Sequence, residues 1–155
     1  MVRRTSRGFT LVEILIVVII LGILAAIVIP QFTSASTEAR ENSTRSQLQT
    51  LRSQIELYKL QHGDAVPNLV GGGAAPGDGT NWAPLTGTTT YAGTTYGPYL
   101  QQVPVNSLNS NSNVVNGTNA AAASAACGFV YDYNGGAGTG RIWATDSGGT
   151  AIFSE

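Results

Sequence analysis

Residues 8–13 read GFTLVE, and each of the sixteen residues that follow, 14–29, is aliphatic or glycine. As an α-helix, residues 9–29 would be about 31 Å long, which matches the hydrocarbon thickness of one bilayer. The preceding residues 1–8 contain three arginines and no acid. We therefore predict a membrane-spanning helix whose basic N-terminal flank lies in the cytoplasm, as the positive-inside rule requires.

Glu13 is the one acid within this apolar span. A carboxylate at the centre of a membrane helix costs at least about 2.5–3.5 kcal/mol on insertion scales, so its presence needs a physical reason. Two interpretations are open from the residue alone. Either Glu13 lies near the lipid headgroups and reaches water, or it meets a positive charge inside an assembly.

The arrangement of these features resembles the class III signal of type IV pilins and type II secretion pseudopilins. A basic leader ends in Gly8, Phe9 follows, and Glu13 precedes the long apolar run. The resemblance covers residues 1–32 and favours the second interpretation of Glu13. It implies that a prepilin peptidase cleaves after Gly8 and that the new amino group of Phe9 is N-methylated. It also places Glu13 at the position of the family's assembly glutamate.

An ion pair between subunits gives a physical reason for these implied roles. Cleavage after Gly8 would remove the three leader arginines and create one ammonium group at Phe9. Glu13 of one subunit could then pair with the ammonium of a neighbour. Because desolvation offsets much of the attraction, we expect the pair to set the register between helices.

Pro30 ends the apolar run. A proline inside a helix removes one backbone hydrogen bond and often produces a kink. From the residues alone, Pro30 marks either the place where the helix leaves the bilayer or a bend. The resemblance favours a role in assembly, because pilin helices carry a proline here.

Composition excludes several classes of function. The precursor has a net charge of −1, and removal of residues 1–8 would leave five basic and nine acidic residues. This balance argues against nucleic acid as the main partner.

Cys127 is the only cysteine, so we predict a buried thiol and no intramolecular disulfide. Many type IV pilins have a C-terminal disulfide. Its absence here, and the similarity of residues 97–100 (GPYL) to a segment of major pseudopilins, favour the pseudopilin branch or a disulfide-free pilin.

Residues 31–63 have the pattern of an amphipathic helix. Leu48, Leu51, Ile55 and Tyr58 recur at spacings of three and four, which places them on one face. Leu57 and Leu60 are expected to widen that face, and Gly63 is expected to end the helix.

The rest of the chain is predicted to be a loop-rich region at 64–128, followed by an antiparallel β-meander at 129–155. Within the first region, residues 106–126 are expected to form a surface loop or a short helix. The meander would have strands at 129–133, 141–145 and 150–153, separated by glycine-rich turns. Its apolar face needs a cover, because a few short strands are only marginally stable. We therefore predict an α+β fold in which the amphipathic half of one long helix packs on a small antiparallel sheet.

Catalysis is not expected. The lone His62, at a predicted helix end, is interpreted as a surface or dipole-satisfying residue, and one histidine cannot build a nucleophile–base pair. Major pseudopilins bind calcium in a C-terminal loop, and Asp146 is a weak candidate ligand here. Calcium prefers about six to eight oxygen ligands, and no acidic cluster surrounds Asp146 in the sequence. Calcium therefore stays an alternative to an ordinary turn aspartate, and no other cofactor is expected.

The resemblance and the residues together predict a structural subunit, a pilin or major pseudopilin. Residues 1–8 would be the leader, 9–30 the membrane and assembly half of the helix, and 31–155 one globular head. Phe9, Glu13 and Pro30 would carry assembly. The expected partners are copies of the chain, minor pilins or pseudopilins, an inner-membrane assembly platform and a prepilin peptidase. The chain would wait in the bacterial inner membrane and then enter a periplasmic or cell-surface filament. The alternative is a membrane-anchored binding module whose head recognises a ligand.

Overall fold

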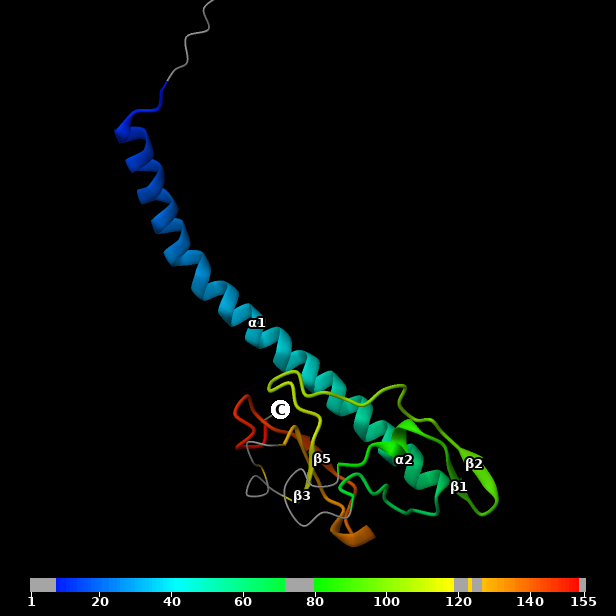
Figure 1. Cartoon of the computed structure of the whole chain (residues 1–155). Coiled ribbons are helices and arrows are strands. Elements are labelled where there is room, and N and C mark those ends of the chain that lie inside the picture. The colour runs from blue at the N-terminus through cyan, green and yellow to red at the C-terminus, as the bar shows by residue number, and fades with distance from the viewer. Residues whose placement is uncertain (1–7, 72–79, 119–122, 124–126, 154–155) are drawn as a thin grey trace, which may run out of the picture. The chain divides into compact units, whose positions relative to one another are not determined.

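Helix α1 runs from Leu11 to Gln61 and is the longest element of the chain (Figure 1). The structure is a computed structural model, which describes residues 8–71, 80–118, 123 and 127–153. The chain divides into two compact units, Met1–Ala39 and Arg40–Glu155, and α1 passes through both. The predicted α+β class is therefore confirmed, with one long helix and small sheets.

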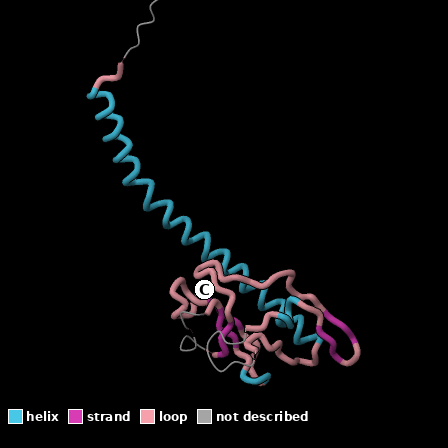
Figure 2. The backbone as a smooth tube through the Cα atoms, viewed as in Figure 1, coloured by secondary structure: helices cyan, strands magenta, loops and turns pink. Residues whose placement is uncertain are grey.

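The short elements all belong to the second unit (Figure 2). They are α2 (Ala83–Thr86), β1 (Thr89–Tyr91), β2 (Thr94–Tyr96), β3 (Val114–Asn116), β4 (Phe129–Tyr131), the 3-10 turn η2 (Asn134–Gly136) and β5 (Ile142–Ala144). Strands β1 and β2 form an antiparallel hairpin, with Thr90 opposite Thr95. The other three strands form a second sheet in the order β3-β4-β5.

The end of α1 follows the prediction. The helix ends at Gln61, and Gly63 adopts a φ of +65°, a left-handed conformation that glycine adopts at little cost. The backbone N–H of Asp64 then donates to the carbonyl oxygen of Lys59 at 2.8 Å, which satisfies one of the last helical acceptors.

The second sheet is mixed, which corrects the predicted antiparallel meander. Strand β4 pairs antiparallel with β5 but parallel with β3, which lies in the segment expected to be a surface loop or short helix. The predicted third strand at 150–153 forms only one isolated bridge, between Thr145 and Ile152. The reason is local: the Asp146 carboxylate accepts hydrogen bonds from the N–H groups of Thr150 and Ala151, so this segment turns instead of extending.

Asn106 explains why the polar segment after it is not a simple surface loop. Its side chain is fully buried, and its Nδ2 donates to the carbonyl oxygens of Gly128 and Thr145, both at 2.8 Å. Its Oδ1 accepts from the N–H of Leu108 at 2.9 Å. The asparagine amide thus pairs with backbone groups in the interior, where an unpaired polar group would be costly.

The core of the head lies between α1 and the second sheet. Leu48, Leu51 and Ile55 are buried, as predicted, against Phe129, Tyr131 and Ile142. Tyr58 is half-buried beside them. The expected widening of this stripe is wrong, because Leu60 is 82% exposed and Leu57 is also exposed. At about 100° per residue, positions 57 and 60 lie about 150° from the centre of the Leu48–Leu51–Ile55 face, on the opposite side of the helix.

A tight loop after β4 is organised by Asp132. Its Oδ2 accepts hydrogen bonds from the Thr139 hydroxyl at 2.6 Å and from the Thr139 N–H at 2.9 Å. These two donors hold the pKa of Asp132 below its ordinary value. The ionised carboxylate is therefore bound more favourably in the folded head than in the unfolded chain.

The core predicts a contrast between two leucines of α1. Leu51→Ala should lower the free energy of unfolding of the head by about 2–5 kcal/mol, because it leaves a cavity in the core. The matched control Leu60→Ala should change it by about 0.5 kcal/mol or less, because that side chain is exposed. Denaturant unfolding of the full chain in detergent, followed by tryptophan fluorescence, checks both. Equal losses for the two variants would contradict this description of the core.

Asp132 predicts a pH dependence of head stability. Because folding lowers the pKa of this group, its contribution is complete above about pH 5 and is lost as pH falls through the folded-state pKa. At pH 7, Asp132→Asn should unfold more easily than the wild type, and the difference should shrink below about pH 4. Denaturant titrations at several pH values measure this difference. A constant difference from neutral to acid pH would exclude the carboxylate as its source.

Candidate functional site at the start of helix α1

Thr10 and Glu13 form a reciprocal hydrogen-bonded cap at the first turn of α1. The Glu13 Oε2 accepts from the Thr10 N–H at 2.9 Å and from the Thr10 hydroxyl at 3.0 Å. The Glu13 N–H in turn donates to the Thr10 Oγ1 at 3.2 Å. Because α1 begins at Leu11, Thr10 occupies the N-cap position and Glu13 the third helical position. This is the geometry of a capping box.

The cap gives Glu13 a local role that was not predicted from the sequence. The sequence nevertheless contains the pattern of a capping box, which is a threonine followed three residues later by a glutamate, directly before an apolar helix. Both Thr10 donors bind Oε2. Among the described hydrogen bonds none ends on Oε1, so this oxygen can accept from a further donor. The cap therefore orients the carboxylate without using all of its acceptor capacity.

Phe9 precedes this cap, and its side chain is 81% exposed. The predicted cleavage residue Gly8 also lies in the described chain, ahead of α1. The structure thus places Gly8, Phe9 and Glu13 together at one helix start. Cleavage, methylation and the assembly roles of these residues stay predictions.

The helix behind the cap contains one stretch that is long and apolar enough to cross a membrane. In the part of the chain that the structure describes, no side chain of that stretch is buried. Pro30 lies inside α1, so the helix does not end there. Its predicted role in assembly is not tested by this arrangement.

The lone histidine lies at the other end of α1, and it is buried and not on the surface. His62 stacks on Tyr58 with a ring separation of 3.9 Å, and its Nδ1 lies 2.9 Å from the Tyr58 carbonyl oxygen, which it satisfies at the helix end. Its Nε2 lies 2.9 Å from the Thr89 hydroxyl of β1. Both ring nitrogens therefore have structural partners, which fits the predicted role at the helix dipole.

Two candidate residues remain, Cys127 and Asp146. Cys127 is buried, as predicted. The carboxylate of Asp146 caps its own turn, and among the described residues no group of three or more histidine, cysteine or acidic side chains could hold a metal ion. Calcium binding stays an untested expectation.

Comparison with known proteins agrees with the site at the start of α1. The family described as "Prokaryotic N-terminal methylation motif" matches residues 3–29. The chain is 42% identical over 62 residues to type II secretion system core protein G of Pseudomonas aeruginosa, covering 40% of this chain and 44% of that protein. For the protein of the same name from Dickeya chrysanthemi, the identity is 41% over 59 residues, covering 38% of this chain and 39% of that protein.

These matches confirm the predicted resemblance to the prepilin and pseudopilin signal, and the chain carries the N-terminal methylation motif. The matched region spans about two fifths of the length of these curated relatives. No solved structure gives a significant match.

The cap predicts a local effect of Thr10. Thr10→Val should remove the side-chain cap and destabilise the first turn by about 0.5–2 kcal/mol, whereas Thr10→Ser should retain it. Amide hydrogen exchange of the first turn, measured by NMR on the full chain in detergent micelles, distinguishes the two variants. Identical exchange in both would show that the Thr10 hydroxyl does not stabilise the helix start.

Proposed function

We propose that this chain is a structural subunit, a pilin or major pseudopilin, that is processed after Gly8 and polymerises through α1 into a helical filament. The observation that carries the proposal is the capped, outward-facing carboxylate of Glu13 at the start of an exposed apolar helix. The methylation motif supports the processing step. The proposal gives the chain no catalytic role.

The apolar surface of the N-terminal half needs a cover. The described side chains from Leu11 to Phe32 are exposed within the single chain. Burying such a surface is favourable at about 25 cal/mol per Å² in either a bilayer or a bundle of identical helices. The same surface therefore serves first as an inner-membrane anchor and then as the core of a filament.

Glu13 supplies the polar contact in this apolar bundle. Cleavage after Gly8 would leave an ammonium group at Phe9, and the Oε1 atom of a neighbour's Glu13 could accept a hydrogen bond from it. The capping box holds that carboxylate in one orientation, which reduces the cost of fixing it on assembly. Adding each subunit head-to-tail by the same contact produces an open helical polymer.

The similarity to type II secretion core protein G favours a secretion pseudopilus over a type IV pilus. In that setting the partners would be further copies of this chain, minor pseudopilins, an inner-membrane assembly platform and a prepilin peptidase. The head would face the periplasm.

Glu13→Gln separates the cap from the charge. Glutamine also fits the third helical position of a capping box, so the helix start should persist while the ion pair is lost. We expect filament yield to fall about tenfold or more, since removing one partner of a buried ion pair costs about 3–5 kcal/mol. Electron microscopy of filaments isolated from whole cells measures assembly, and mass spectrometry of the N-terminus measures processing.

The matched control is Glu38→Gln, which removes another exposed acid of α1 and should leave filament yield unchanged. Normal filaments from Glu13→Gln would reject the proposed ion pair. A chain that keeps residues 1–8 and stays monomeric after detergent extraction would instead favour the membrane-anchored binding module.

A further inference from the structure

The head contains two Asn-Gly dipeptides, Asn116-Gly117 and Asn134-Gly135, and the fold surrounds them differently. An asparagine followed by glycine deamidates readily, because glycine has no side chain to hinder the attack of its backbone nitrogen on the asparagine side chain. As dipeptides the two sites are equivalent. The hydrogen bonds around each one distinguish them.

The reacting groups of Asn116-Gly117 are held by the second sheet. Asn116 is the last residue of β3 and pairs with Tyr131 of β4. The N–H of Gly117 donates to the Tyr131 carbonyl oxygen at 3.0 Å. The Asn116 Oδ1 accepts from the N–H groups of Tyr133 and Asn134, both at 3.1 Å. The nucleophilic nitrogen and the side-chain amide can therefore meet only after β3 opens locally.

The reacting groups of Asn134-Gly135 are not held in this way. Asn134 begins the turn η2, and its side chain is exposed. The hydrogen bonds that fasten Asn134 use its backbone, because its N–H donates to Asn116 and its carbonyl oxygen accepts from the N–H of Ala137. Among the described hydrogen bonds, none involves the Asn134 side chain and none starts at the Gly135 N–H.

The backbone of the turn is also open to water. Asn134 and Gly135 have φ values of +43° and +63°, a left-handed conformation that asparagine and glycine adopt more readily than other residues. A Cβ atom added at Gly135 would meet no atom within 4 Å. Water and base can therefore approach the Gly135 nitrogen from this side.

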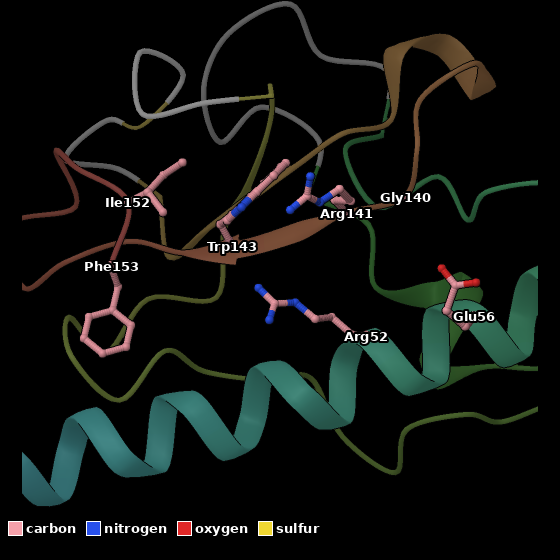
Figure 3. Close-up of a pocket in the computed structure, with 7 residues that line it drawn as sticks. All are labelled: Arg52, Glu56, Gly140, Arg141, Trp143, Ile152 and Phe153. Carbon is pink, nitrogen blue, oxygen red and sulfur yellow. The ribbon is translucent and has the colours of Figure 1, made fainter. Parts of the chain in front are cut away.

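The groove between α1 and strand β5 does not include this turn (Figure 3). It has a volume of about 560 Å³, and Arg52 and Glu56 of α1 and Trp143 of β5 are among the residues that line it. No residue of η2 belongs to its described lining. The groove therefore neither covers nor shields Asn134.

We propose that Asn134 is a site of spontaneous modification, at which deamidation through a succinimide produces aspartate and isoaspartate. Base removes the proton of the Gly135 N–H, and the nitrogen electron pair forms a bond to the Asn134 Cγ. The bond from Cγ to Nδ2 breaks, and the nitrogen takes up a proton and leaves as ammonia. Water then opens the ring. Breaking the new bond to Cγ gives aspartate, whereas breaking the original peptide bond gives isoaspartate.

The two products have different consequences for the turn. Both add one negative charge to the loop that already contains the ionised Asp132 carboxylate. Aspartate tolerates the left-handed conformation about as well as asparagine does. Isoaspartate inserts one more carbon into the main chain, so it should weaken the hydrogen bonds by which Asn116 holds the turn. The modification does not depend on whether the chain polymerises.

A time course on the folded full chain in detergent micelles, at mildly alkaline pH in heavy-oxygen water, tests the proposal. Chymotryptic cleavage after Tyr131 separates the two asparagines, and mass spectrometry of the peptides measures their conversion. Asn134 should convert at least about tenfold faster than Asn116, since one well-formed hydrogen bond of β3 can lower the reactive fraction by about that factor. Each product should contain one heavy oxygen atom from the water that opened the ring, and conversion should accelerate as pH rises.

Two controls make the test specific. In urea neither dipeptide keeps its surroundings, so both should convert at similar rates. Asn134→Gln should stop the change at residue 134, because the longer side chain closes a larger ring slowly, and should leave Asn116 conversion unchanged. Equal rates at the two sites in the folded chain, or faster conversion at Asn116, would overturn the proposal. Conversion of Asn134 in urea but not in the folded chain would also overturn it.

Discussion

The head depends on the burial of one narrow apolar stripe of α1. The strands of the second sheet are only three residues long, and sheets of this size are marginal without a packing partner. Leu48, Leu51 and Ile55 supply that partner. All three residues of β4 are buried: Phe129 and Tyr131 face the α1 side, while Val130 packs with Val115 and Cys127 in a second cluster. The central strand is thus covered on both faces.

The same helix has the opposite character further upstream. A helix that is apolar all round is stable only when something surrounds it, and none of the described residues buries the candidate membrane span. One continuous element therefore combines a segment that folds against its own chain with a segment that needs lipid or other helices. This division gives a physical reason why α1 passes through two separate units.

Glu13 shows how one residue can serve local structure and proposed assembly together. Within the chain its Oε2 caps the helix start, a role that needs only a neighbouring threonine. Glutamine could also fill the third position of a capping box, but an acid in the first turn gains in addition from the positive end of the helix dipole. An ionised acid is nevertheless costly in an apolar environment. In the proposed filament, the ammonium group of a neighbouring subunit would offset that cost.

Local patterns in the sequence determined the features that depend on neighbouring residues. The helix, its end near Gly63, the Leu48–Leu51–Ile55 stripe and the prepilin-type signal all follow from spacing and composition within short stretches. Only the tertiary structure decided that Val114–Asn116 pairs parallel with β4 and that Asn106 is buried. These outcomes depend on contacts between distant segments. The polar Asn106 is stable in the interior because the carbonyl groups of Gly128 and Thr145, far along the chain, accept its hydrogen bonds.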